Sequence, residues 1–146
     1  MARYRTWITA SMDREQAFSA LSHFDRAAEW DPGVESAEML TPEPVGLGSR
    51  FALAARFGGR TLPLVYEIVD YQHADRLVLR AENAFVRSVD TITFEDLSDH
   101  TAITYDARLV PKGVSRLAAP LFAVAFRRIG DRATAGLRAY LNRPER

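Results

Sequence analysis

The sequence predicts an α+β domain in which a seven-stranded antiparallel sheet wraps around one long C-terminal helix. Three observations predict this fold class. Apolar and polar residues alternate with the period of two of a β-strand through most of residues 34–109. From residue 114 onward the apolar period changes to that of an α-helix. Short turns separate the strand-like runs, and neighbouring strands joined by short turns must be antiparallel.

The first part of the chain predicts one strand and two short helices. Residues 3–11 are rich in aromatic and β-branched types, which favour a strand. Ser11 or Asp13 can cap the helix that follows. Its apolar stripe has helical spacing and consists of Ala17, Phe18, Leu21 and Phe24. Residues 25–30 predict a second short helix, which ends before Asp31-Pro32-Gly33 because the residue before a proline avoids helical geometry.

Six further strands are expected at residues 34–40, 49–57, 60–71, 76–82, 85–95 and 101–109. The run 41–48 contains prolines and glycines that a central strand would not tolerate, so it predicts a loop. Gly58 and Gly59 predict a two-residue hairpin turn of the kind that needs positive φ. These strands complete the seven-stranded sheet.

A long helix is expected after Gly113, and its apolar face is the cover that the sheet needs. Pro120 either kinks this helix or marks its true start, because a proline removes a backbone donor. No other predicted helix is long enough to lie across the sheet. The stripe consists of Val114, Leu117, Ala118, Leu121, Phe122, Ala125, Ile129, Ala133, Leu137 and Tyr140.

Composition bounds the protein to one domain over residues 1–146 and excludes several kinds of site. The chain of 146 residues has no cysteine, so disulfides, thiolate nucleophiles and thiolate zinc sites are absent. His23, His73 and His100 lie far apart in the sequence, and we expect neither a metal nor a cofactor. No run of eighteen apolar residues is present. We therefore expect a cytoplasmic protein without stable membrane insertion.

The zero net charge conceals an asymmetry between the two parts of the chain. Residues 112–146 hold eight basic residues and two acidic ones, so they carry +6 and the first 111 residues carry −6. An arginine-rich helix can contact RNA, an anionic membrane or a partner protein, or it can simply face solvent. We expect the solvated face, with the acidic and basic parts attracting each other and no nucleic acid as partner.

Several local motifs accompany this order of elements. They are Trp30-Asp31-Pro32 and residues 46–51, 57–60, 76–80, 89–95, 101–106 and 126–129. The order of elements together with these motifs resembles the START-like or Bet v 1-like helix-grip (SRPBCC) superfamily. The resemblance is closest to its bacterial branch of polyketide cyclase/dehydrase-like and lipid-transport-like proteins. It implies a deep apolar cavity between sheet and helix that holds a lipid, polyketide, isoprenoid, quinone or hormone.

The side chains that would line such a cavity follow from strand alternation and from the helix stripe. If the more apolar face of each strand faces the helix, alternate residues point inward. Trp30 either gates the cavity mouth or is a core tryptophan. The expected ligand-binding residues are Trp30, Phe51, Leu53, Phe57, Leu64, Tyr66, Ser88, Asp90, Ile103, Tyr105, Leu117, Leu121 and Ala125.

Asp90 is the most informative of these positions. Placing Ile92 and Phe94 inward also turns Asp90 inward, so a carboxylate faces an otherwise apolar space. A buried aspartate must be paired, hydrogen-bonded or neutralised, because desolvation raises its pKa. Asp90 is therefore either a general acid or base, an anchor for a ligand hydroxyl, or a structural acceptor for Tyr66, Tyr105 or an arginine. The remaining alternative is a bulge that shifts the alternation of this strand and changes which way Asp90 faces.

Three functions remain open at this point. The favoured one is a carrier or sensor for a hydrophobic small molecule, because the residues that commonly perform chemistry are scarce. The second is a polyketide cyclase or dehydratase that uses Asp90 as acid and base. The third is an interaction module that uses the arginine-rich helix. The sequence leaves open whether the protein is a monomer or a homodimer and which way Trp7 faces, and we expect Arg56 and Arg87 to face solvent.

Overall fold

The structure is a computed structural model that describes residues 2–57 and 59–144. Seven strands form one antiparallel sheet in the order β1-β7-β6-β5-β4-β3-β2. The predicted order of strands and helices is confirmed, and no strand boundary differs from the expected one by more than two residues. The elements are β1 (Ala2–Ala10), α1 (Arg14–Ser22), the 3-10 helix η1 (Phe24–Glu29), β2 (Val34–Met39), β3 (Arg50–Phe57), β4 (Arg60–Gln72), β5 (Arg76–Glu82), β6 (Val86–Asp96), β7 (Thr101–Pro111), the 3-10 helix η2 (Gly113–Ala118) and α2 (Ala119–Leu141).

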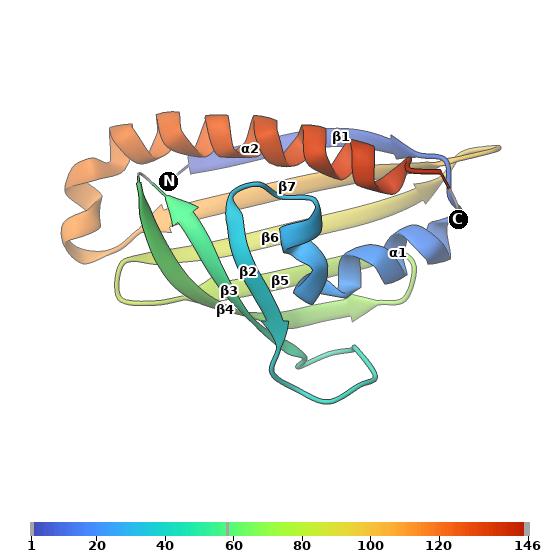
Figure 1. The fold of residues 1–146 in the computed structure, drawn as a ribbon, viewed down its shortest axis with the longest axis horizontal. Helices are drawn as coiled ribbons and strands as arrows, with labels where there is room; N and C mark the ends of the chain where they lie inside the picture. The colour runs from blue at the N-terminus through green and yellow to red at the C-terminus, as the bar shows by residue number, and fades with distance from the viewer. Residues whose placement is uncertain (1, 58, 145–146) are drawn as a thin grey trace.

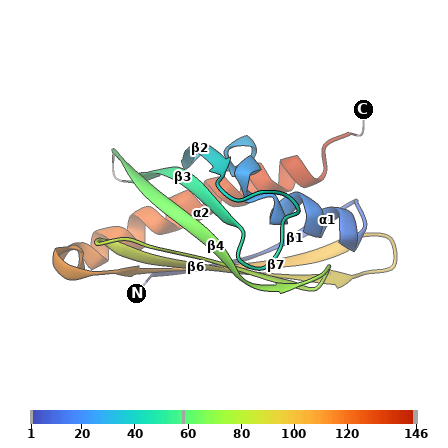
Figure 2. The same cartoon turned by 90° about the horizontal axis from the view of Figure 1, so that it is seen from below.

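The sheet curls so that its two ends face α2 from different sides. In Figures 1 and 2, α2 runs alongside β1, while β2, β3 and part of β4 rise out of the plane of β6 and β7. The register slips between Val34 and Ser36 in β2 and between Ile68 and Asp70 in β4. Such irregularities bend a strand and increase its twist, which is how the sheet closes around the helix.

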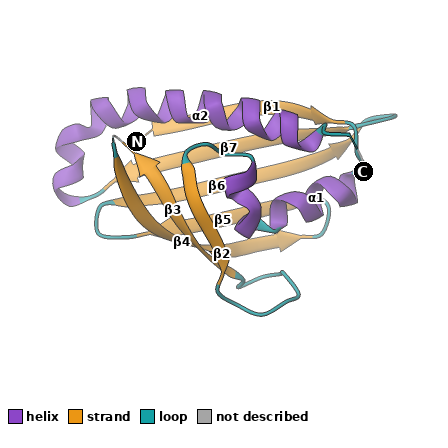
Figure 3. Ribbon diagram, in the orientation of Figure 1, coloured by secondary structure: helices purple, strands orange, loops and turns teal. Residues whose placement is uncertain are grey.

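The short helices close the end of the sheet where the C-terminus lies (Figure 3). Asp13, one of the two predicted caps, accepts a hydrogen bond of 2.8 Å from the backbone N–H of Gln16. The Gln16 side chain accepts in return from the N–H of Asp13, and this reciprocal capping box fixes where α1 begins. The buried ring of Phe18 then packs edge-on against Tyr71 and Phe94.

Pro120 marks the true start of α2 rather than a kink within a longer helix. Residues 113–118 form the separate 3-10 helix η2, and Pro120 lies in the first turn of α2. A proline is tolerated there because the first helical N–H groups have no partner within the helix. The apolar periodicity from Val114 therefore belongs to two helices with different axes and phases.

Two glycines let α2 lie unusually close to its neighbours. A Cβ atom at Gly130 would overlap the ring of Tyr4 on β1. A Cβ atom at Gly136 would overlap the carbonyl oxygen of Trp30, at the end of η1. These contacts set the distance between α2 and the rest of the fold, and so the width of the space beneath the helix.

The β3–β4 turn contains Gly59, whose φ of +79° agrees with the positive φ expected for a two-residue hairpin turn. Gly58, the other residue of that predicted turn, lies outside the described residues. Pairing on either side is regular, with Phe57 opposite Arg60 and Leu53 opposite Leu64. The hairpin therefore delivers alternate side chains of β3 and β4 to the inner face of the sheet.

Candidate ligand-binding site

A pocket lies between the inner face of the sheet and α2. Its wall is formed by residues of β1, β3, β4, β6, β7 and α2, together with the segment between η1 and β2. The space that the centre of a water-sized sphere can occupy is about 130 Å³. Most of the wall is apolar, and its larger apolar side chains include Ile8, Leu53, Phe57, Leu64, Leu109 and Phe126. An apolar wall with a few polar groups is typical of small-molecule sites.

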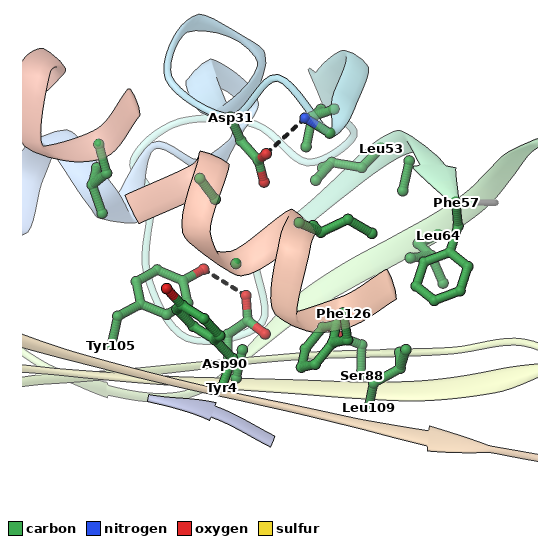
Figure 4. A pocket seen from close by; sticks show the side chains of 18 of the residues that line it. Tyr4, Asp31, Leu53, Phe57, Leu64, Ser88, Asp90, Tyr105, Leu109 and Phe126 are labelled. Carbon is green, nitrogen blue, oxygen red and sulfur yellow. Dashed lines mark hydrogen bonds between the residues drawn. The ribbon is translucent and has the colours of Figure 1, made fainter. Parts of the chain in front are cut away.

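Asp90 is the carboxylate on the sheet side of this pocket, as strand alternation predicted. It is 7% exposed and pairs with Ala107 of β7, so Ser88, Asp90 and Ile92 all face the helix. The Tyr105 hydroxyl donates a hydrogen bond of 2.5 Å to its Oδ2 atom (Figure 4). Burial raises the pKa of Asp90 to about 7, although the bond from Tyr105 opposes the rise.

A second polar pair lies beside the first. The hydroxyls of Tyr66 and Ser88 are 2.8 Å apart and buried, and either one can be the donor. Ala81 of β5 is the partner of both residues in the strand register, so Tyr66 reaches across this small residue from β4 to β6. Burial raises the pKa of the Tyr66 hydroxyl, which therefore remains a neutral donor and acceptor.

Asp31 is a second carboxyl group on the pocket wall. The sequence places it in a turn and in the motif Trp30-Asp31-Pro32, but not among the expected pocket residues. Its Oδ1 accepts a hydrogen bond of 2.8 Å from the backbone N–H of Gly33, as aspartates commonly do in turns. In Figure 4, Asp31 approaches from the loop before β2, while Asp90 approaches from the sheet. Burial raises the pKa of Asp31 to about 6, opposed by the Gly33 bond.

Trp30 packs over the polar group as a buried side chain. Its ring packs edge-on against Tyr105 and Phe24, with distances between ring centres of 6.2 Å and 6.4 Å. Trp30 is 6% exposed. It also lies on the pocket wall, so the same indole packs in the core and lines the cavity. The contact with Trp30 restricts the Tyr105 ring and thereby helps to fix the hydroxyl that reaches Asp90.

The expected set of ligand-binding residues divides into those on the pocket wall and those elsewhere. Phe51 and Ile103 face inward as expected, but both are fully buried in the packed core and do not line the pocket. The residues that the structure does bring to the wall are Trp30, Leu53, Phe57, Leu64, Tyr66, Ser88, Asp90 and Tyr105. Whether they bind a ligand stays a prediction.

The three expected positions before Phe126 require correction. Leu117 is 89% exposed and Leu121 is 73% exposed, and Ala125, although half-buried, is not on the pocket wall. The error arose because Leu117 belongs to η2, before α2 begins, so the helical phase of α2 does not extend to it. The part of α2 on the pocket wall instead consists of Phe126, Ile129, Gly130, Ala133, Thr134 and Leu137.

The three strand residues singled out for their facing are all exposed. Trp7 lies on the outer face of β1, with the guanidinium of Arg5 5.4 Å from its ring centre. Arg87 is near Glu82 on the surface. Arg56 is exposed as expected and also contributes to the pocket rim, where its guanidinium donates to the carbonyl oxygen of Pro32 at 2.9 Å.

Within residues 2–57 and 59–144, no group of three or more His, Asp or Glu side chains is placed to hold a metal ion. In that same part of the chain, no helix combines the length and apolar composition needed to cross a membrane.

Solved structures with the same fold cover almost the whole chain. The Zhui aromatase/cyclase from Streptomyces sp. R1128 superposes with a TM-score of 0.79 at 13% identity, covering 95% of this chain and 92% of that one. A START superfamily protein from Mycobacterium smegmatis gives 0.73 at 14% identity, covering 97% of each. Major latex-like protein 151 from Panax ginseng gives 0.65 at 11% identity, covering 96% of this chain and 97% of that one.

These likenesses confirm the predicted helix-grip fold, and at such low identity they concern the fold alone. No curated protein matches the chain in sequence. A family model does match, and it spans residues 1–142. With a match over nearly the full length, the predicted resemblance is confirmed: the chain belongs to the polyketide cyclase/dehydrase and lipid transport family.

Proposed function

We propose that this protein binds one hydrophobic small molecule of lipid, polyketide, isoprenoid or quinone type in the pocket, as a carrier or sensor. The observation that carries the proposal is the apolar wall with a polar group at one place, where Asp90 and Tyr105 meet. A few convergent polar groups in an apolar cavity orient a ligand while burial supplies affinity. The sheet and α2 enclose this one cavity, which supports a single domain over residues 1–146.

The polar group supports a ligand whose apolar body ends in a carbonyl or hydroxyl. Because the pKa of Asp90 is raised to about 7, a large share of Asp90 is a neutral acid at neutral pH, and its hydroxyl can donate to a ligand oxygen. The Tyr66 and Ser88 hydroxyls offer a second donor and acceptor nearby. A ligand without a carbonyl or hydroxyl oxygen could not form a hydrogen bond with Asp90, Tyr66 or Ser88.

Filling the pocket tests this proposal. Ala133 is on the pocket wall, so Ala133→Phe places a ring in the cavity, whereas Ala139→Phe places the same ring on the exposed face of α2. Native mass spectrometry of the purified protein, with fatty acid, quinone and polyketide probes, measures occupancy. We expect the wild type and Ala139→Phe to bind and Ala133→Phe to lose binding. An empty wild-type pocket with every probe contradicts the proposal.

A second candidate function is favoured by one observation, the buried carboxyl whose pKa lies near neutral. General acid–base catalysis is most effective when the pKa of the catalytic group is close to the working pH. In an aldol cyclisation, ionised Asp90 would take a proton from the carbon between two carbonyls. The carbanion would attack a third carbonyl, and protonated Asp90 would return its proton to the resulting alkoxide. Tyr105 would orient the Asp90 carboxyl.

Asp90→Asn distinguishes the enzyme from the carrier. For a cyclase, this variant loses turnover of a poly-β-keto substrate while its affinity for a stable analogue stays within a few-fold of the wild type. Equal turnover by the wild type and the variant, or release of unchanged substrate by both, contradicts the enzyme and leaves the carrier.

A further inference from the structure

Exposed apolar side chains gather at the end of the molecule where α2 begins. Leu117 and Leu121, which were expected inside the cavity, are 89% and 73% exposed, and Val114 is 77% exposed. Phe85 in the β5–β6 turn joins them, because its carbonyl oxygen accepts a hydrogen bond of 2.7 Å from the N–H of Lys112, next to η2. The residues of this apolar tip are Phe85, Val114, Leu117, Leu121 and Val124, all of them more than half exposed.

Basic residues flank the apolar tip, and acidic residues are few there. Residues 107–130 contain no aspartate or glutamate, and Asp131, which follows, accepts a hydrogen bond from the Tyr4 hydroxyl. Within the described part of the chain, no ion pair involves the exposed arginines of η2 and α2, so the expected attraction to the acidic sheet does not take the form of side-chain pairs. This arginine flank consists of Arg116, Arg127, Arg128 and Arg132.

The apolar tip adjoins one end of the pocket. Leu121 faces outward, while the next residue, Phe122, turns inward and packs edge-on against Phe57, with ring centres 4.9 Å apart. Phe57 and Leu62 both belong to the pocket wall. The start of α2 and the turn between β5 and β6 lie at the same end of the fold in Figures 1 and 3. A surface that covered the tip would therefore lie next to the cavity.

We propose that the apolar tip and the arginine flank dock this protein peripherally on a membrane surface that contains anionic lipids. Apolar side chains of an interfacial helix enter the boundary between headgroups and acyl chains, and arginines at its side pair with lipid phosphates. The docking is peripheral because no helix of the described residues can span a membrane. It does not depend on the proposed function, since the surface exists whether or not the pocket holds a ligand.

Two other occupants fit the surface less well. A nucleic acid would pair with the arginines through its phosphates, yet five exposed apolar side chains in the same surface would face a polar backbone. A second copy related by a two-fold axis would bring both arginine flanks together, and like charges in an interface oppose association. A membrane with anionic headgroups satisfies both kinds of side chain at once.

Vesicle flotation of the full chain tests the proposal. Vesicles are phosphatidylcholine alone, or phosphatidylcholine with an equal part of phosphatidylglycerol. We expect binding to the mixed vesicles, weaker binding at high salt, and little binding to the neutral ones. Arg127→Gln/Arg128→Gln should lower the partition coefficient about 25-fold, since each basic residue near the surface contributes roughly fivefold. Leu117→Ser/Leu121→Ser should lower it on the order of tenfold or more, through lost apolar burial.

Matched controls remove the same kinds of side chain elsewhere. Leu47→Ser removes an apolar residue that is 71% exposed in the loop before β3, and Arg5→Gln/Arg26→Gln removes two exposed charges far from α2 in the sequence. Both controls should stay within about twofold of the wild type. Equal losses in controls and tip variants overturn the proposal.

Other results would overturn the proposal as well. One is a wild type that does not bind vesicles, or that binds them equally well at low and high salt. Another is binding to RNA without binding to vesicles. A third is that the tip variants only convert a dimer to a monomer. Probe binding by the pocket in solution is measured on the same samples. Tip variants should retain it, so a failure of membrane docking is separable from a failure of the proposed ligand-binding function.

Discussion

The Tyr105 hydroxyl donates a hydrogen bond of 2.5 Å to Oδ2 of Asp90, inside a pocket whose wall is otherwise mainly apolar. Two opposing effects determine the pKa of Asp90. Burial raises the pKa of Asp90, whereas the hydrogen bond stabilises its ionised form and lowers it. The balance places the pKa at about 7, and each contribution can be tested separately.

Removing the donor should raise the pKa of Asp90 above about 7, since burial then acts without that hydrogen bond. Tyr105→Phe makes this change and keeps the ring that packs against Trp30. Carboxyl-carbon NMR titration measures the pKa directly. Tyr66→Phe is the control, because the Tyr66 hydroxyl bonds to Ser88 rather than to Asp90. An unchanged or lowered pKa in Tyr105→Phe contradicts the assigned role of the bond.

Asp90 should make the protein less stable as the pH rises from about 5 to about 8. Its folded pKa of about 7 lies above the unfolded value near 4, so between these two pKa values the folded state binds the proton and the unfolded state does not. The free energy of unfolding therefore decreases as the pH rises toward the folded pKa, and the decrease levels off above it. The wild type should lose roughly 2 to 3 kcal/mol that Asp90→Asn does not lose.

Urea denaturation of both proteins at each pH provides the measurement, and other titrating groups cancel in the difference. Glu38→Gln, which removes an exposed carboxyl, should follow the wild type. Parallel curves for wild type and Asp90→Asn would show that Asp90 is ionised in the folded protein throughout the interval.

The inward position of Asp90 could be predicted because β6 has no bulge along its pairing with β7. With a regular register, the facing of Ile92 and Phe94 determines that of Asp90 and Ser88. The sequence could not show that Asp31 joins them, since its position depends on a turn in which the side chain accepts from Gly33. An aspartate beside Trp30 in a predicted turn was the available signal, but it equally indicates a turn alone.

The prediction that Leu117, Leu121 and Ala125 line the pocket was wrong for a different reason. A single helical period fitted to residues 114–140 assumes one axis, whereas Pro120 begins a new helix after η2. Leu117 consequently turns to solvent, although its spacing matches the stripe. Leu121 belongs to α2, but the inward position there is taken by the next residue, Phe122, which packs against Phe57. Sequence spacing reports which residues share a face only within one continuous helix, and it does not fix which edge of a wide apolar stripe faces the core.

The side chain of Asn142 ties the end of α2 to the end of β1. Its Oδ1 accepts from the N–H of Ser11 at 2.9 Å, and its Nδ2 donates to the carbonyl oxygens of Thr9 and Arg138. Asn142→Ala removes all three bonds and should lower the free energy of unfolding by about 1 to 2 kcal/mol, as exposed hydrogen bonds are individually weak. Equilibrium denaturation measures the loss.

Asn142→Asp keeps the acceptor for Ser11 but places a carboxylate oxygen against two carbonyl oxygens, so it should cost at least as much as the alanine variant. Gln72→Ala removes a surface amide whose bonds go to Asp70, and it should change stability by about 0.5 kcal/mol or less. A stable Asn142→Asp variant would show that the two donated bonds contribute nothing.

Gly136 should be the least replaceable glycine of α2, because its missing side chain is the space that the carbonyl oxygen of Trp30 occupies. Alanine at this helical position gains about 1 kcal/mol in helix propensity. The Cβ atom cannot fit without moving α2 from the η1–β2 segment, and overpacking of this kind costs about 1 to 3 kcal/mol or more. Because the obstacle is backbone rather than a flexible side chain, we expect Gly136→Ala to be destabilised overall.

The shift of α2 should also alter the pocket, since Ala133 and Leu137 on either side of Gly136 belong to its wall. Denaturation together with probe binding therefore measures both consequences of Gly136→Ala. Gly46→Ala is the matched control, because a Cβ atom there has no neighbour within 4 Å. It should change neither stability nor binding. If Gly136→Ala were instead more stable than the wild type, α2 would not be held against Trp30 as closely as the structure indicates.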